Sequence, residues 1–445
     1  MRRAAVVLIL VVAIGAAIRL SKGREAPPAD FRFISRASIH TLDPARMTYI
    51  QDIQACQSLW EGLTQLDAQT FEPIGGSALW PPRYGDDGRQ VVFAIHPKAR
   101  WSNGDPVTAH DFVRGWRRAI EPGTADVYAE LISDHIAGAE AYTDWRTAWM
   151  NTLSVIRRLQ KNSPVKAETL AKALRSEAGG TLAGLLTVPI PHPPPGEQDE
   201  FWQRAAGALA NIRQNWKVLG DRLLDAHIAE LEDRFARVGL RAVDDQHLEV
   251  MLARPTPYLG DLASFSTFMP IHESIEILRE RYEGRPLSDT GVWAHDPQWT
   301  KPDYHQAGYP GLVTNGPYTL RQWHFKRRMR FEANPHYRDR GHVRSRTVES
   351  LDSEYQNSAF MLYEQGVVDA VMDLSMDYTP ELVRLARQGK RDDIHPIPSF
   401  GTYYLVANCR PRLNDGRPNP CGDARVRRAL TRAINRQEIV DNVVR

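Results

Sequence analysis

The sequence has little cysteine and lacks the short motifs that mark common enzyme classes. Only three cysteines occur in 445 residues, and no two have the C-x-x-C spacing of zinc or redox sites. No glycine-rich phosphate loop and no GxSxG elbow is present. His272-Glu273 begins like a zinc-protease helix, but Glu276 stands where the second histidine ligand is needed. These absences argue against a hydrolase, a kinase or a nucleotide enzyme, so we expect no enzymatic activity, no metal and no cofactor.

An excess of one charge is also missing. The chain carries 56 Lys and Arg against 54 Asp and Glu, a formal net charge of +2. Such a balance gives no reason to expect a nucleic-acid partner. A composition of 42% apolar and 25% charged residues is typical of a globular protein, and the length predicts two or three domains.

Long apolar runs are absent except at the N-terminus. Arg2-Arg3 precede an apolar run over residues 4–18. A helix of about 15 residues covers roughly 22 Å, less than the ~30 Å hydrocarbon core of a bilayer. The pattern predicts a signal peptide within residues 1–24, or an uncleaved N-terminal anchor as the alternative. Either one predicts export to the periplasm or cell envelope, with membrane contact only through this segment.

Two of the three cysteines flank a turn-rich stretch. Cys409 and Cys421 enclose RPRLNDGRPNP, and in an exported protein they are candidates for a disulfide. Closing so short a loop is worth about 3 kcal/mol in the chain-entropy model. Two free thiols are the alternative.

The stretch WSNGDPVTAHDFV (101–113) predicts a turn followed by a capped helix rather than a catalytic loop. Asn103-Gly104 forms a turn, and Thr108 with Asp111 has the spacing of a capping box at a helix start. The following helix would bury one apolar face, with Arg114, Arg117 and Arg118 mostly off that face.

The rest of the chain mixes strand and helix patterns. We expect strands at 247–252, 318–325, 328–334 and 402–408, and helices at 53–63, 358–365, 380–388 and 423–440. Between them, residues 142–236 have the pattern of long amphipathic helices split by the proline-rich VPIPHPPPGE. The mixture predicts an α/β protein.

Seven segments in a fixed order carry a family resemblance. They are LDPARMTYIQD (42–52), LWEGL (59–63), ARWSNGDPVTAHDFVRGWRRAIEP (99–122), TNGPYTLRQWHFKRRMRFEANPHYRD (314–339), YEQGVVDAV (363–371), GTYYLVAN (401–408) and DARVRRALTRAINRQEIV (423–440). Together they resemble the extracellular solute-binding proteins of family 5, the oligopeptide- and dipeptide-binding components of ABC importers.

The resemblance implies a two-lobed, Venus-flytrap α/β fold with mixed sheets and an extra family-specific domain. Lobe I would comprise residues 31–52 and 313–399, and the second domain 53–312, with a helical insertion at about 142–236. Residues 400–445 would begin lobe II. The resemblance further implies a monomer that binds short peptides in extended form and delivers them to ABC permease subunits. Adding a peptide as a strand satisfies the backbone groups that all peptides share.

The same resemblance nominates ligand-contacting residues. Met372 and Asp373 occupy positions where relatives often carry asparagine. The candidates are Thr48, Tyr49, Ile50, Tyr128, Asp373, Tyr403 and Tyr404.

Other outcomes stay open at the level of sequence. The same fold can serve as a non-transport sensor or protein-interaction module that uses the helical insertion, and relatives bind nickel, sugars or opines. Relatives also continue well beyond the position of Arg445, and the acidic residue that pairs with the peptide amine lies in that continuation. We therefore expect the chain as written to bind peptides weakly or not at all.

Overall fold

The computed structural model describes most of the chain. The described residues are 27–35, 37–124, 127–160, 169, 173, 216–277, 297–302, 310–353, 356–372, 374–375, 377–395 and 404–439. They form two compact units, one of Met1–Glu354 with Leu362–Met372 and one of Tyr355–Met361 with Asp373–Arg445.

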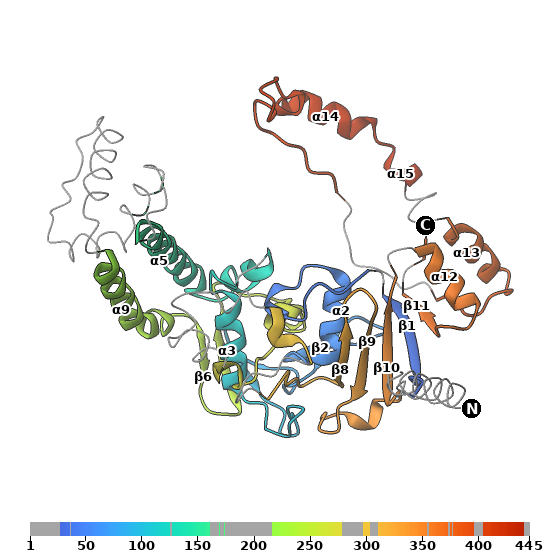
Figure 1. Ribbon diagram of the computed structural model, residues 1–445, viewed down its shortest axis with the longest axis horizontal. Coiled ribbons are helices and arrows are strands. Elements are labelled where there is room, and N and C mark those ends of the chain that lie inside the picture. Colours follow the sequence, from blue (N-terminus) through green and yellow to red (C-terminus); the bar gives the residue numbers. More distant parts are fainter. Residues whose placement is uncertain are drawn as a thin grey trace, which may run out of the picture. The chain divides into compact units, whose positions relative to one another are not determined.

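The larger sheet of the first unit has five strands in the order β11-β1-β10-β9-β8 (Figure 1). Its members are β1 (Phe31–Ser35), β8 (Tyr318–His324), β9 (Arg328–Ala333), β10 (Thr347–Asp352) and β11 (Ala370–Val371). β1 pairs in parallel with both β10 and β11, while β8, β9 and β10 are antiparallel neighbours. The carboxyl ends of β1, β10 and β11 therefore lie at the same end of the sheet. The chain leaves β1 at that end and continues into the LDP segment.

A second, four-stranded sheet in the same unit is entirely antiparallel, in the order β4-β5-β7-β6. It comprises β4 (Arg83–Tyr84), β5 (Gln90–Ala94), β6 (Leu240–Ala242) and β7 (His247–Met251), and a separate ribbon pairs β2 (Thr64–Leu66) with β3 (Pro73–Gly75). The strands predicted at 247–252, 318–325 and 328–334 are confirmed. Each sheet lies within one of the two predicted segments, lobe I or the second domain, but the boundary between these segments stays a prediction.

The first unit also contains helices, some of which pack against these sheets. They are η1 (Pro44–Arg46), α2 (Ile50–Leu59), α3 (Ala109–Ala119), η2 (Val127–Ala129), α4 (Glu130–Ser133), α5 (Ala139–Gln160), α9 (Trp216–Phe235), α10 (Leu259–Ala263), η3 (Ser266–Phe268), η6 (Pro297–Thr300) and η7 (Arg340–His342). α2 packs against β8, and α3 against β6 and β7. The helix predicted at 53–63 thus begins earlier and ends at Leu59.

The predicted capping box starts α3. The Asp111 carboxylate accepts the backbone N–H of Thr108 at 2.9 Å and also the indole N–H of buried Trp101 at 3.0 Å. α3 then packs closely on the chain around η3, since a Cβ at Gly115 would lie 2.4 Å from the Met269 carbonyl oxygen. The motif WSNGDPVTAHDFV is therefore a structural element, as predicted.

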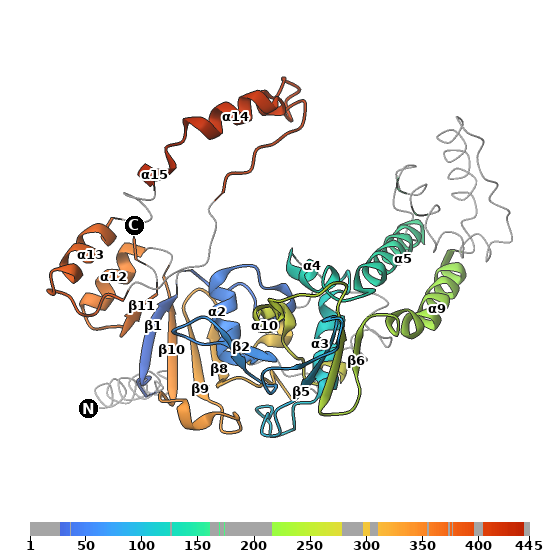
Figure 2. The same ribbon diagram turned by 180° about the vertical axis from the view of Figure 1, so that it is seen from behind.

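Helices α5 and α9 run side by side and form the described part of the predicted helical insertion (Figures 1 and 2). Between them, the His227 ring lies 4.7 Å from both the Trp145 and the Trp149 rings. Burial lowers the pKa of His227 to about 3, so this ring is a neutral part of the core. The proline-rich VPIPHPPPGE lies outside the described residues.

The second unit contains short helices. They are α13 (Thr379–Arg387), η8 (Pro420–Gly422), α14 (Ala424–Ala433) and α15 (Arg436–Ile439), while α12 (Gln356–Glu364) starts in this unit and ends in the first. The helices predicted at 358–365 and 380–388 are confirmed. The single helix predicted at 423–440 is instead two, because the backbone of Ile434 is extended.

Candidate functional site

A buried ion pair holds the LDP segment in place. Arg118 donates to Asp43 through both terminal nitrogens, at 2.7 and 2.6 Å, and both side chains are almost completely buried. Asp43 also caps η1 by accepting the Ala45 N–H. The expectation that Arg118 lies mostly off the buried face of its helix is wrong, because its charge is neutralised inside the core by a partner 75 positions away. The bidentate pair fixes the residues that follow.

Those residues are the first three candidates, and they lie at the surface. Thr48 is half-buried, whereas Tyr49 and Ile50 are 54% and 51% exposed. Tyr49 is the N-cap residue of α2, and its ring stacks on His40 with centroids 4.7 Å apart. An exposed tyrosine with one ring face already packed is a preorganised contact surface.

The buried carboxylate of Asp52 holds the neighbouring residue His40 in place. Asp52 has no exposed surface, and its Oδ1 accepts the backbone N–H of His40 at 2.8 Å. Burial raises the pKa of Asp52 to about 6. Asp52 thus holds His40, and through the ring stack it also positions Tyr49.

Tyr128 lies on the neighbouring element. It sits on η2, which packs against η1, and it is half-buried with its ring edge-on to Phe265 at 4.9 Å. The adjacent Val127 is 62% exposed. The structure therefore places Thr48–Ile50 just after η1 and Tyr128 on η2, the short helix that packs against η1 in the same unit.

The other three candidates lie outside the described residues or in the second unit. Asp373 and Tyr403 lie outside the described residues, and Tyr404 is 73% exposed in the second unit. Met372 follows β11 and is 53% exposed. The strand predicted at 402–408 is wrong over its described part, since residues 404–408 belong to none of the described sheets and their backbone groups have no partner strand.

Cys409 and Cys421 are both free thiols in the structure. Hydrogen bonds close the loop between them instead. The Asn419 side-chain amide donates to the carbonyl oxygens of Asn408 and Arg410, both at 2.8 Å, and its backbone N–H donates to Pro411. The two ends of the loop are therefore held close, and the disulfide stays a prediction.

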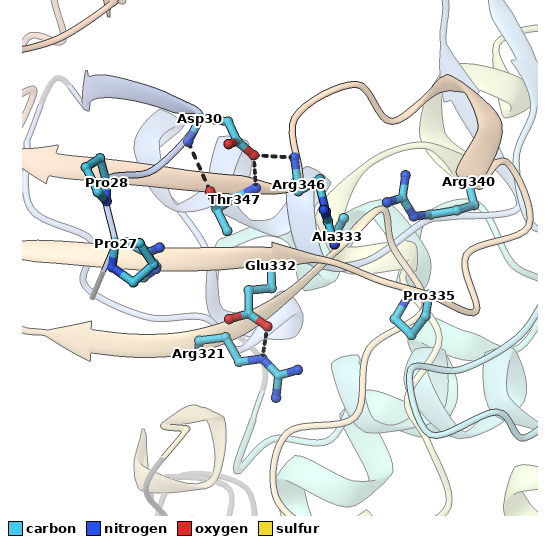
Figure 3. A pocket seen from close by; sticks show the side chains of 11 residues that line it. Pro27, Pro28, Asp30, Arg321, Glu332, Ala333, Pro335, Arg340, Arg346 and Thr347 are labelled. Atoms are coloured by element: carbon cyan, nitrogen blue, oxygen red, sulfur yellow. Dashed lines mark hydrogen bonds and ion pairs between the residues drawn. The ribbon is translucent and has the colours of Figure 1, made fainter. Parts of the chain in front are cut away.

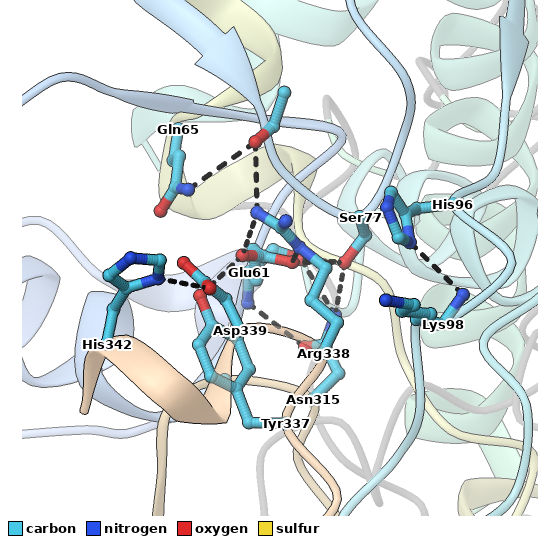
Figure 4. Close-up of polar contacts among 12 residues, drawn as sticks. Glu61, Gln65, Ser77, His96, Lys98, Asn315, Tyr337, Arg338, Asp339 and His342 are labelled. Atoms are coloured by element: carbon cyan, nitrogen blue, oxygen red, sulfur yellow. Dashed lines mark hydrogen bonds and ion pairs between the residues drawn. The ribbon is translucent and has the colours of Figure 1, made fainter.

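Sequence reasoning missed a buried polar network around Glu61 (Figure 4). Glu61 accepts from the Tyr337 hydroxyl at 2.7 Å and from Arg338 at 2.8 and 2.9 Å, and its backbone exchanges two hydrogen bonds with the Asn315 side chain. Burial alone would lower the pKa of Arg338, but the bonds to Glu61 outweigh it and the net shift is upward. The position of Glu61 inside the apolar run LWEGL could have indicated this network, because a buried charge requires a partner.

Within the described ranges, no three His, Cys, Asp or Glu side chains gather closely enough to hold a metal ion. Among the helices that the structure describes, none combines the length and apolar character needed to cross a bilayer.

Known proteins resemble this chain along most of its length. The family model for bacterial extracellular solute-binding proteins, family 5 Middle, matches residues 77–179 and 190–445. The probable deoxycholate-binding periplasmic protein YgiS of Escherichia coli (strain K12) is 23% identical over 420 residues, which cover 94% of this chain and 56% of that relative. The periplasmic oligopeptide-binding protein OppA of the same organism is 23% identical over 408 residues, covering 92% and 53%. The chain thus spans about half the length of the curated relatives it matches.

A solved structure is similar as well. The Escherichia coli murein tripeptide binding protein MppA superposes with a TM-score of 0.58 at 20% identity, covering 94% of this chain and 58% of that one. The predicted fold class, an α/β periplasmic-binding-protein fold with mixed sheets, is confirmed.

Proposed function

Because the chain belongs to the bacterial extracellular solute-binding proteins of family 5, we propose that it captures short peptides and delivers them to the permease of an ABC importer. The observation that carries the proposal is the exposed Tyr49–Ile50 pair, which lies just after η1, the short helix that packs against η2 with Tyr128. The resemblance nominated these residues as ligand contacts.

The chemistry of this surface suits a ligand of variable sequence. Tyr49 offers an apolar ring and a hydroxyl, and the Asp52–His40 support keeps it in place without occupying its exposed face. Aromatic rings held in advance bind with a small loss of conformational entropy. Ligand backbone groups would then be satisfied by strand-like pairing.

Photo-crosslinking tests the proposal because it detects weak as well as tight binding. A tripeptide with a benzophenone side chain is irradiated with the protein, and labelled fragments are mapped by mass spectrometry. We expect label in the fragments that contain Tyr49 or Tyr128, and a several-fold loss of label in Tyr49→Ala. Tyr84→Ala is the matched control, because Tyr84 is 48% exposed but lies on β4. Label elsewhere, or equal losses in both variants, would contradict the proposal.

A second candidate ligand comes from the name of one relative, a probable deoxycholate-binding protein. Unlabelled peptide and deoxycholate are therefore compared as competitors in the same experiment. If deoxycholate competes and the unlabelled peptide does not, the ligand of this site is a steroid acid and not a peptide.

Export, a monomeric state and the permease partnership belong to the same proposal. Export is supported by the leader-like residues 1–24, and the permease partnership by relatives that are periplasmic binding proteins. A sensor or protein-interaction role through α5 and α9 is the alternative. Neighbouring permease and ATPase genes would favour transport, and a neighbouring sensor kinase gene would favour that alternative.

A further inference from the structure

A groove of about 620 Å³ lies against the β8–β9 hairpin and the start of β10 (Figure 3). Four of the residues that line it are arginines, and they come from different elements. They are Arg321 on β8, Arg330 on β9, Arg340 on η7 and Arg346 just before β10. Only two carboxylates, Asp30 and Glu332, line the same groove.

Both carboxylates are already engaged. Glu332 accepts the Arg321 Nε–H at 2.8 Å, and Asp30 accepts the backbone N–H groups of Arg346 and Thr347, each at 2.8 Å (Figure 3). Four guanidinium groups against two carboxylates leave the groove with a formal charge of +2. The excess is local, because the chain as a whole is nearly neutral.

Arg330 is the least exposed of the four. It is only 6% exposed, and within the described residues its side chain has no hydrogen bond or ion pair. The carboxylate opposite it in the strand register, Glu349, instead bonds Arg328 at 3.4 Å. Because the Arg330 guanidinium lines the groove and its donors have no partner among the described residues, an anion in the groove would supply the acceptors that they lack.

We propose that this groove binds a phosphate group. Guanidinium forks match phosphate oxygens, and groups from several elements can surround a tetrahedral anion. Pro27 and Pro28 also line the groove, and only two residues separate them from the leader-like residues 1–24. A phospholipid headgroup at a membrane surface is therefore one source of the phosphate, and free phosphate is the other.

Calorimetric titration of the full chain with inorganic phosphate at low salt tests the site. We expect saturable binding that weakens about tenfold or more in Arg330→Gln, since a charge-assisted hydrogen bond is lost. The double variant Arg340→Gln/Arg346→Gln should weaken binding as well, and it keeps the readout if Arg330→Gln fails to fold. Arg344→Gln is the charge-matched control, because Arg344 is exposed and does not line the groove.

Vesicle sedimentation distinguishes the two sources. Phosphatidylcholine vesicles with and without about one-third phosphatidylglycerol are compared, so that any contribution of the apolar N-terminal run cancels. A phosphatidylglycerol-dependent gain that the groove variants lose, and Arg344→Gln keeps, assigns the site to lipid headgroups. Saturable phosphate binding without that gain assigns it to free phosphate. Absence of both, or equal losses in Arg344→Gln, would overturn the proposal.

Discussion

Glu61 and Arg338 form a buried bidentate ion pair although they lie 277 positions apart in the chain. Their side chains are 4% and 13% exposed, and the pair joins the LWEGL and NPHYRD segments. Tyr337 and Asn315 complete the network around Glu61. These contacts tie the chain just after α2 to the segments on both sides of the β8–β9 hairpin.

Removing the charge of Glu61 should destabilise the first unit strongly. We expect Glu61→Gln to lower the free energy of unfolding by about 3–5 kcal/mol, because Arg338 would remain buried without a counter-charge. Glu332→Gln is the control, since its pair with Arg321 is exposed and should be worth less than about 1 kcal/mol. Urea denaturation followed by tryptophan fluorescence measures both. Similar losses would refute a special role for the buried pair.

Asp52 should make stability depend on pH. Its pKa is raised from 3.8 to about 6 in the fold, so its protonated form is favoured and its contribution is complete below about pH 4. That contribution is lost as pH rises through about 6. We expect Asp52→Asn to become more stable than the wild type as pH rises, by up to about 3 kcal/mol near neutrality. Denaturation curves measured from pH 4 to 7 check this, with Asp86→Asn at an exposed position as the control. A difference that does not change with pH would count against a titrating Asp52.

Gly115 should not tolerate a side chain. Although alanine has the better helix propensity by about 1 kcal/mol, its Cβ would collide with the Met269 carbonyl oxygen. We expect Gly115→Ala to lower the melting temperature, with a loss of about 1–3 kcal/mol from overpacking. Gly341→Ala meets no atom within 4 Å and should stay within about 0.5 kcal/mol. A stabilised Gly115→Ala would show that the backbone around Met269 yields easily.

Cys409 and Cys421 should form a disulfide when the protein is made in an oxidising compartment. Asn419 already holds the two flanking segments together, which favours closure of the loop. Peptide mapping without reduction should reveal the linked fragments, and Cys409→Ser should abolish the link. The bridge is expected to add about 3 kcal/mol of stability. Alkylation of both thiols in the native exported protein would exclude it.

The sequence by itself determined the elements whose signals are local. The capping box of Thr108 and Asp111 and the alternating pattern of residues 247–251 depend on neighbours within a few positions, and both appear as predicted. The ordered motifs also determined the family, because many weak matches in one order reinforce each other.

Only the tertiary structure decided which charges are buried and with whom. Arg118 finds Asp43 and Arg338 finds Glu61 across long stretches of chain, so no periodicity marks these pairs. The same limit explains why the strand predicted at 402–408 is wrong over its described residues 404–408. Alternation shows that a segment can be a strand, but a strand also needs a partner to satisfy its backbone. Likewise, four arginines scattered between residues 321 and 346 line one groove only because the β8–β9 hairpin and the start of β10 bring them together in the fold. Local propensity acts between near neighbours, whereas burial and charge pairing are settled by contacts that exist only in the folded chain.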